Sequence, residues 1–581
     1  MLSDKILVLG DDINTDDIIP AKRGTNLDPA HLGYYALEYL IGAGQLANYE
    51  IIEAGENFGC GSSREIAPLA LKAAGIQKIY ARSFAEIFYR NSINIGLPLE
   101  IIGEQRSSPI EAAIVAAGGL FAFNQQRLNG AALPVGQTAP RPMTLAEKLI
   151  ARAAGQAYVQ PGEALLVKAD LAMSHDAIAG PVGALFHQHF GAEARLWDAQ
   201  RLVLVADHFI QINEIRPDPK AIAMHQQMVE FAQAQGCHLL DVVSPGEAAG
   251  ICHVLLPERG FVHPGMVIVG TDSHSCTYGA FGCFSTGIGT TDMANLFATG
   301  DLWLRVPATL KLELNGILPK QVSAKDIMLF ILGKIGCDGA IGRVIEFCGE
   351  VIENLPIDER MTLANMAVEC GAVSGLIAPD AQTWDYVNAK GHLNARGHMN
   401  ARGYEAEPIN LASDPGAEYE RLYQFDLSQL EPQIARPPQP DQVVGISEMQ
   451  EVKITRAFIG SCTGGKLFDL AQAAAVLQNR RVAAGVSLFV VPASQAVRQQ
   501  AEALGYLKTL EQAGAQILKS GCGACINAGQ GVLGAAEVGI YATNRNFRGR
   551  SGDPTAQNYL ASPRTVAISA VNGRISDRFE D

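Results

Sequence analysis

The sequence predicts an α/β protein with several domains. It has 581 residues, of which 48% are hydrophobic, and a chain of this length is well above the size at which a single core stops growing. Glycine is abundant, with 59 residues, and aromatic residues make up only 7%, as in α/β enzymes with many tight turns. Short β-branched runs that alternate with helical apolar spacing indicate the same fold class.

The first 122 residues are predicted to form one compact α/β unit. Short β-branched strands are expected at residues 5–9, 49–53, 78–81 and 98–102. Helical apolar spacing occurs between them, at residues 63–74 and 84–91. The turn at residues 58–64 leads directly into the first of these helices, so the N–H groups at the helix start would form an anion pocket.

Two proline-containing stretches are expected to separate the remaining parts of the chain. Residues 123–142 lack hydrophobic periodicity and predict a linker. Residues 431–448 predict a second connection, which divides a middle block of two α/β units (143–430) from a C-terminal α/β unit (449–581). A duplication at residues 389–403 repeats only a few residues, and therefore predicts a surface insertion rather than a solenoid.

Charge and composition argue against several classes of protein. The net charge of −15 disfavours a nucleic-acid surface, and anionic substrates would need local arginine clusters. The eleven cysteines are scattered, the first residues lack a signal-peptide hydrophobic region, and no apolar run reaches transmembrane length. We expect a cytoplasmic protein with free thiols and with neither a nucleic-acid nor a membrane partner.

Three cysteines near the C-terminus form a set that is one thiolate short of a closed four-ligand site. They are Cys462 in Gly-Ser-Cys-Thr and the pair Cys522 and Cys525 in Gly-Cys-Gly-Ala-Cys. Their spacing alone fits two hypotheses equally: an iron–sulfur cluster with one open corner, or a zinc or redox hairpin with Cys462 as an unrelated thiol. Both motifs follow apolar runs in Gly-rich turns, where α/β proteins build their sites.

A Gly-rich turn in the N-terminal unit carries a second group of polar residues. Ser62, Ser63 and Arg64 lie at a predicted helix start within Gly-Cys-Gly-Ser-Ser-Arg-Glu. They can supply an activated hydroxyl, a carboxylate clamp and backbone donors. The alternative is an ordinary helix cap with a solvated arginine. The preceding Phe-Gly-Cys-Gly requires tighter backbone geometry than a cap does.

Histidines and aspartates recur in the middle block after short apolar runs and before turns. The residues are Asp176, Asp207, His208, His253, Asp272 and His274. In doubly wound folds this pattern places side chains at the carboxyl ends of strands, around one crevice. A carboxylate beside a histidine fixes the imidazole tautomer and holds the ring ready as acid or base. Each histidine alone is more often structural, so the recurrence carries the prediction.

Arginines cluster after the cysteine pair. Arg545, Arg548 and Arg550 occur within six residues, and the guanidinium group binds carboxylates with two parallel hydrogen bonds. A solvated basic loop is the alternative. Beside an open metal corner, these arginines indicate a substrate with more than one carboxylate.

Taken together, these motifs resemble the aconitase superfamily, most closely its isopropylmalate dehydratase branch. Residues 1–122, with Asp-Asp-Ile-Ile-Pro, Asn-Phe-Gly-Cys-Gly-Ser-Ser-Arg-Glu and Ser-Phe-Ala-Glu-Ile-Phe, resemble the small subunit or swivel domain. Residues 143–581, with Gly-Thr-Asp-Ser-His, Gly-Ser-Cys-Thr, Cys-Gly-Ala-Cys and Asn-Arg-Asn-Phe, resemble the large subunit. The resemblance implies a three-domain aconitase-like region preceded by a swivel domain in the same chain, so that no separate small subunit is needed.

The resemblance also implies a cofactor and residue roles. Cys462, Cys522 and Cys525 would hold three irons of a 4Fe-4S cluster, and the fourth iron would be open to the substrate. Ser62 would remove the proton next to a carboxylate. The other implied catalytic residues are Asp207, His208, Asp272, His274, His253 and Glu346. The implied substrate-binding residues are Arg64, Ser63, Arg545, Arg550, Asn544, Asp176, Lys22 and Arg23.

Some positions differ from the pattern of the family. Ile66 stands where a histidine is usual, and Gly464-Gly465-Lys466 replaces the usual Asn-x-Arg. The loop after Pro20, which selects the substrate side chain in the family, contains Lys22 and Arg23 and lacks the common aromatic-Leu pair. A hydro-lyase acting on 3-isopropylmalate is the favoured function. Aconitate, homoaconitate and dimethylmalate substrates stay open, as do an RNA-binding regulator and an inactive zinc scaffold.

Overall fold

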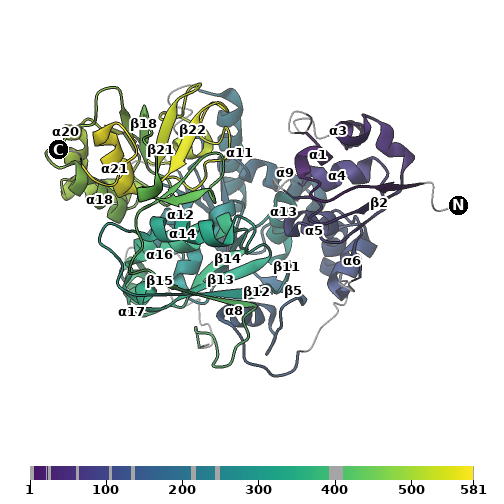
Figure 1. Cartoon of the computed structure of the whole chain (residues 1–581). Helices are drawn as coiled ribbons and strands as arrows, with labels where there is room; N and C mark the ends of the chain where they lie inside the picture. The colour runs from purple at the N-terminus through teal and green to yellow at the C-terminus, as the bar shows by residue number, and fades with distance from the viewer. Residues whose placement is uncertain are drawn as a thin grey trace.

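Four helix-covered sheets form most of the described part of the chain in the computed structural model (Figure 1). The structure describes residues 5–20, 23, 28–60, 65–103, 108–131, 138–210, 217–241, 249–391 and 410–579. Most strand pairs are parallel and the helices cross over between them, which confirms the predicted α/β class.

The N-terminal unit contains a parallel sheet with the order β1-β2-β3-β4. These strands span Ile6–Val8, Ile51–Ala54, Lys78–Ala81 and Leu99–Ile101, close to the predicted ranges. Its helices are α1 (Thr15–Ile18), α2 (Pro29–Tyr35), α3 (Glu38–Ile41), α4 (Ile66–Ala73), α5 (Glu86–Asn94), α6 (Pro109–Ala117) and α7 (Leu120–Leu128). A capping box between Ser108 and Glu111 starts α6, and the left-handed Gly118 ends it.

The second unit is a five-stranded parallel sheet with the order β10-β9-β6-β7-β8. Its strands span β6 (Leu171–His175), β7 (Leu202–Val205), β8 (His238–Leu240), β9 (Val267–Gly270) and β10 (Phe284–Gly287). All residues of β7 and β9 are buried and apolar or glycine, as expected for strands covered on both faces. The helices are α8 (Leu145–Ala154), α9 (Ala179–Phe190), α11 (Pro219–Gln235), α12 (Cys252–Glu258) and α13 (Thr290–Thr299).

The third unit is a four-stranded parallel sheet with the order β14-β13-β12-β15. The strands span β12 (Ala308–Asn315), β13 (Arg343–Cys348), β14 (Ser374–Ile377) and β15 (Arg421–Asp426). The helices of this unit are α14 (Ala324–Ile335), α15 (Glu350–Asn354), α16 (Ile357–Met366) and α17 (Ala381–Gly391). The predicted insertion at residues 389–403 falls almost entirely outside the described residues.

The C-terminal unit is a seven-stranded sheet with the order β17-β16-β22-β21-β18-β19-β20. The strands span β16 (Gln433–Ala435), β17 (Val443–Gly445), β18 (Arg456–Ile459), β19 (Ser487–Val490), β20 (Gln516–Ile517), β21 (Val538–Tyr541) and β22 (Gln557–Leu560). The helices are α18 (Leu467–Leu477), α19 (Gln495–Ala503), α20 (Tyr506–Ala513) and α21 (Pro563–Asn572). Strands β16 and β17 are antiparallel.

The two predicted connections are more structured than expected. Helix α7 extends to Leu128, so the first part of the predicted linker is helical. Residues 431–448 contribute β16 and β17 to the C-terminal sheet and therefore belong to that unit. The four prolines of this stretch flank the two strands and lie within neither, so they remove no ladder hydrogen bond from them.

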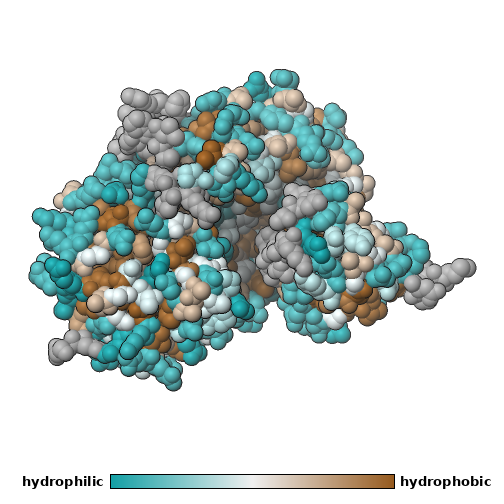
Figure 2. Space-filling model, turned by 90° about the horizontal axis from the view of Figure 1, so that it is seen from above, coloured by the Kyte–Doolittle hydropathy of each residue, from teal (hydrophilic) through white to brown (hydrophobic). Residues whose placement is uncertain are grey.

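The N-terminal and C-terminal units lie at opposite ends of the molecule, over the second and third units (Figure 1). Seen from above, the surface is hollowed between these two lobes (Figure 2). A small antiparallel pair, β5 (Ala164–Lys168) and β11 (Asp301–Arg305), places Ala164 and Trp303 in the core of the N-terminal unit. Among the described helices, none is long and apolar enough to cross a bilayer. All eleven cysteines are free thiols.

Candidate functional site

The carboxyl ends of three neighbouring strands bring the predicted aspartates and histidines together. Asp176 follows β6, Asp207 and His208 follow β7, and Asp272 follows β9. Strand β6 lies between β9 and β7 and pairs in parallel with both, so these three strand ends meet at one edge of the sheet. This agrees with the shared crevice that the recurrence in the sequence predicted.

Asp207 and His208 form a closely held pair. His208 Nδ1 lies 2.5 Å from Asp207 Oδ1, and Asp207 Oδ2 accepts a hydrogen bond from the Cys252 backbone N–H (2.9 Å). Asp176 accepts from the His208 backbone N–H (3.0 Å). Burial disfavours the charged imidazole, but Cys522 and Asp207 together hold the pKa of His208 well above its usual value. His175 stacks on His208 at 3.9 Å between ring centroids.

Asp272 joins three histidines. Its Oδ1 lies 2.8 Å from His253 Nε2 and accepts a hydrogen bond from the His274 backbone N–H (2.7 Å), and its Oδ2 lies 3.7 Å from His208 Nε2. Burial opposes the charged form of this carboxyl, but the contacts with His253 and His274 keep its pKa well below the usual range. Asp272 is therefore an anion that orients the rings around it.

Glu369 extends this network to the arginine loop. Its Oε1 lies 2.9 Å from His274 Nε2 and accepts from Arg545 Nε at 2.9 Å. Burial disfavours its charge, yet Arg545 and His274 lower the pKa of Glu369 to about 2. The sequence pattern pointed instead to Glu346, which lies on β13 and accepts hydrogen bonds from Ser413 and Tyr419. Among the described contacts, none joins Glu346 to the other predicted site residues.

The glutamate of the site was missed because it lies on a helical segment rather than after a strand. Glu369 lies in a short 3-10 helix that follows α16, and Asn365 lies near the end of α16. Both are buried, as are the polar residues Glu359, Arg360 and Thr362 earlier in α16. Two polar residues four positions apart on a buried helical face are the signal that could have identified them.

The three cysteines lie at the ends of strands in the C-terminal unit, facing the histidines. Cys462 follows β18, and the pair Cys522 and Cys525 follows β20. The Cys522 backbone N–H donates to the Asp207 carbonyl (3.1 Å), and its Sγ lies 3.9 Å from His208 Nδ1. Cys462 Sγ accepts from Asn365 Nδ2 (3.2 Å). Burial, followed by the effect of the nearby Cys525, raises the pKa of Cys462 to about 12.

This donor set fits an iron–sulfur cluster better than a single zinc ion. A single ion requires ligand atoms that lie close together. In the described residues, the groups of His, Cys, Asp and Glu whose ligand atoms all lie within 4.8 Å of one another do not include the three cysteines. A zinc ion bonds thiolates at about 2.3 Å, so sulfurs that share it lie at most about 4.6 Å apart. A 4Fe-4S cluster binds its thiolates on different irons and does not require them to meet at one ion. The three cysteines therefore do not fit as ligands of one shared zinc ion in this arrangement.

Two histidine and carboxylate groups satisfy the distance requirement for a single ion. They are His175, Asp176, Asp207 and His208, and His253, Asp272 and His274. Hydrogen bonds and ion pairs within the network described above join the members of both groups, apart from His175. His175 stacks on His208, and its buried Nδ1 has no hydrogen-bond partner among the described residues.

The departures from the family pattern have structural reasons. A Cβ on Gly464 would lie 2.4 Å from the Ala542 carbonyl oxygen, and one on Gly465 would lie 2.5 Å from the Val491 carbonyl oxygen. No side chain fits at either position without movement of the backbone. Lys466 is buried and its ammonium lies 2.9 Å from Asp469 Oδ2. Ile66, at the start of α4, packs against the core of the N-terminal unit.

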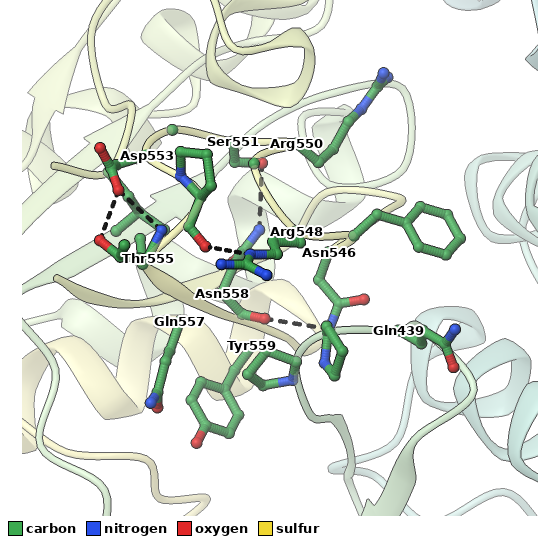
Figure 3. Close-up of a pocket in the computed structure, with 18 of the residues that line it drawn as sticks. Gln439, Asn546, Arg548, Arg550, Ser551, Asp553, Thr555, Gln557, Asn558 and Tyr559 are labelled. Atoms are coloured by element: carbon green, nitrogen blue, oxygen red, sulfur yellow. Dashed lines mark hydrogen bonds between the residues drawn. The ribbon is translucent and has the colours of Figure 1, made fainter. Parts of the chain in front are cut away.

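The other predicted site residues lie in three places: beside Cys462, at a surface pocket of the C-terminal unit, and in the N-terminal unit. Asn544 contacts Cys462. Arg550 lines an open pocket of about 800 Å³ together with Arg436 and Arg548, at the surface of the C-terminal unit (Figure 3). Its side chain points away from Arg548 in this view, and its buried Nε has no hydrogen-bond partner among the described residues.

The residues predicted in the N-terminal unit are mostly outside the described part of the chain. Ser62, Ser63, Arg64 and Lys22 fall there. Arg23 is described, and its guanidinium pairs with Glu38 (3.0 Å) and lies over the ring of Tyr35.

Polar contacts attach the N-terminal unit to the second unit beside the predicted serine turn. Glu65, the residue after Arg64, accepts hydrogen bonds from the backbone N–H and the hydroxyl of Thr291, both at 3.1 Å. Arg90 forms two hydrogen bonds to Asp292 (3.0 and 2.8 Å). Burial and the nearby charge of Asp292 raise the pKa of Glu65 to about 7.

Comparison with protein families identifies two regions. Residues 154–451 and 447–573 match the profile of the aconitase family, described as aconitate hydratase. Residues 45–104 match the profile of the aconitase C-terminal domain, which here lies in the N-terminal unit.

Curated relatives match most of the chain. A probable methanogen homoaconitase large subunit from Methanothermobacter thermautotrophicus is 45% identical over 436 residues, which cover 75% of this chain and 97% of that protein. A 3-isopropylmalate dehydratase large subunit from Methanopyrus kandleri is 43% identical and covers 75% and 98%. A crystal structure of 3-isopropylmalate dehydratase from Methanocaldococcus jannaschii is 32% identical, with a TM-score of 0.19, over 22% of this chain and 93% of that one.

Proposed function

Because this chain belongs to the aconitase family and is therefore a hydro-lyase, we propose that it isomerises a 2-hydroxy di- or tricarboxylate by dehydration and rehydration on a 4Fe-4S cluster. The observation that carries this proposal is the continuous network from Cys522 through His208, Asp272 and Glu369 to Arg545. The thiol of Cys522, the imidazole of His208 and the guanidinium of Arg545 therefore lie on one side of the site, which is called the wall below.

The three cysteines would hold the cluster. Cys462, Cys522 and Cys525 fit it by their number and by the chemistry of their thiols. When bound, a cluster with one iron free of protein ligands supplies a Lewis acid for a substrate hydroxyl and carboxylate.

We assign the proton transfers to two sides of the substrate. On the wall, His208 keeps its Nδ1 proton against Asp207 and, in the imidazolium form, can deliver its other proton to the departing hydroxyl from Nε2, the nitrogen that faces Asp272. From the N-terminal unit, Ser62 would remove the proton next to a carboxylate, with the N–H groups at the start of α4 and Arg64 nearby in sequence. Arg545 is held by Glu369 and would orient a substrate carboxylate.

The favoured substrate is 3-isopropylmalate. Relatives named as 3-isopropylmalate dehydratase and as homoaconitase support both this substrate and homoaconitate. The family match at residues 45–104 supports the proposal that residues 1–122 replace a separate small subunit. We propose the same division for the remainder: a linker within 123–142, two units to residue 430, and the cluster-bearing unit after it, now including β16 and β17.

A substrate panel on reconstituted enzyme tests the proposal. The full chain is treated anaerobically with iron and sulfide, and the enoate product is followed in the near ultraviolet with 3-isopropylmalate, citrate, homocitrate and 2,3-dimethylmalate. We expect hydration and dehydration of 3-isopropylmalate at the highest kcat/KM. A reconstituted chain that carries iron and labile sulfide and yet converts none of these acids contradicts the proposal.

A further inference from the structure

A lysine lies buried beside the loop of Cys462, at a position that no sequence motif marks. Lys325 is the second residue of α14, and only 1% of it is exposed. Its ammonium donates to the hydroxyl of Thr463 (3.2 Å) and to the carbonyl of Thr543. Thr463 follows Cys462 directly, so Lys325 contacts both the loop of one cysteine and the loop that carries Asn544 and Arg545.

This position is unfavourable for a cation in two ways. The start of a helix carries partial positive charge, and a buried ammonium loses its hydration. No carboxylate of the described residues lies within 4.0 Å of Lys325 Nζ, whereas the equally buried Lys466 pairs with Asp469 at 2.9 Å. The loss of hydration on burial lowers the pKa of Lys325 to about 8, so this ammonium is still mostly charged at neutral pH.

The negative charge nearest to Lys325 can come from Glu369 or from the cysteines. Glu369 is already neutralised by Arg545 and contacts His274. Thr463, which accepts a hydrogen bond from the ammonium, directly follows Cys462, and a cysteine binds a metal as a thiolate. Metal binding therefore brings the ammonium of Lys325 the compensating negative charge that no carboxylate of the described residues provides.

We propose that Lys325 is the buried counter-charge of the cysteine thiolates, a positioning residue that stabilises the cluster-bound form and not the metal-free fold. This inference rests on the proposed function, because it requires that Cys462 and Cys525 bind iron. This role differs from that of a purely structural lysine, because loss of a structural lysine would destabilise both the cluster-bound and the metal-free protein.

The experiment compares Lys325→Met with Lys334→Met, an exposed lysine on the same helix. Each full-length variant is reconstituted anaerobically, and the rate of cluster loss to a chelator is measured from the visible absorbance. Metal-free samples are unfolded with urea in parallel. Residues behind metal ligands change affinity by about 10–100-fold, and we expect Lys325→Met to lose its cluster about tenfold faster while the metal-free protein unfolds at an unchanged or higher urea concentration. Lys334→Met should match the wild type in both.

Two further variants separate charge from shape. Lys325→Arg should retain most of the cluster stability and Lys325→Gln should not, and the reduction midpoint followed by electron paramagnetic resonance should fall only when the charge is removed. If Lys325→Met weakens the metal-free fold and leaves cluster loss at the wild-type rate, Lys325 is merely structural. A wild-type chain that takes up no iron and sulfide would instead overturn the proposed function.

Discussion

The wall and the contact between the N-terminal and second units are held by different kinds of hydrogen bond. In the wall, backbone N–H groups fix the acids: Asp176 accepts from His208, Asp207 from Cys252, and Asp272 from His274. In the contact with the second unit, most of the polar bonds join side chains, such as Arg90 to Asp292 and Arg127 to Asp301.

This difference separates rigid from adjustable parts of the site. Groups tied to backbone amides are preorganised, as electrostatic catalysis requires. Apolar anchors such as Trp303 and Ala164 also join the core of the N-terminal unit, and the ion pairs beside them resemble the polar contacts between domains. We infer that the wall keeps its geometry whether or not the N-terminal unit is closely docked.

Removing a thiol from the wall should have the largest effect. Cys462→Ala should bind little iron and labile sulfide after reconstitution and show no turnover, because one of three ligands is lost. Iron and sulfide content and visible absorbance give the measurement. Cys348→Ala, a thiol on β13 with no proposed role, is the matched control and should retain its cluster. Normal cluster content in Cys462→Ala would show that this cysteine is not a ligand.

Removing the hydroxyl of Ser62 in the N-terminal unit should stop turnover without affecting the binding of the cluster at the wall. Ser62→Ala should lower kcat by about 10²–10⁴-fold, the usual contribution of a positioned acid or base. The cluster spectrum should stay that of the wild type. Loss of the cluster in this variant would instead place Ser62 in the wall and contradict its assignment to proton transfer.

Breaking the contact between the units should loosen only the N-terminal unit. Asp292→Asn leaves Arg90 without its charged partner, and loss of one member of a largely buried pair costs about 3 kcal/mol. We expect faster hydrogen exchange in β2 and β3 and unchanged exchange in β6 and β7. The exposed pair of Arg343 and Glu420 provides the control, because Glu420→Gln should change stability by less than about 1 kcal/mol. Equal loosening of both units would contradict the separation.

The smallest expected effect is a pH dependence of docking at Glu65. The pKa of Glu65 is about 7 in the folded chain, above the usual value of 4.5, so the folded state binds the proton more tightly. The stabilisation is complete below about pH 4.5 and is lost as pH rises through about 7, with an upper limit of about 3 kcal/mol. Protection of the N-terminal unit against hydrogen exchange, relative to the intrinsic exchange rate at each pH, should therefore fall from pH 5 to 8. Glu65→Gln should remove most of this dependence, and an unchanged profile would assign it to other groups.

Much of the site was predictable because strand ends carry a local signal. Asp207, His208, Asp272 and the cysteines follow short apolar runs directly, and parallel pairing brings such ends together. Glu369 and Asn365 gave no such signal, because they lie on helical segments that approach the site from another unit. Glu346 was implied by the family resemblance and not by a strand end, and in the structure it accepts hydrogen bonds from Ser413 and Tyr419.

The sequence by itself determined the fold class, because residue types and local spacing encode it, and the motifs that it shares with a known family indicated the reaction class. Only the tertiary structure decided which charges face one another. Among the described contacts it joined Glu369, and not Glu346, to the histidine network, explained Gly464 and Gly465 by close backbone approach, and placed Lys325 against Thr463, next to Cys462. Such contacts join residues more than a hundred positions apart, for example Lys325 and Thr463, and no local pattern specifies the burial that gives them their energy.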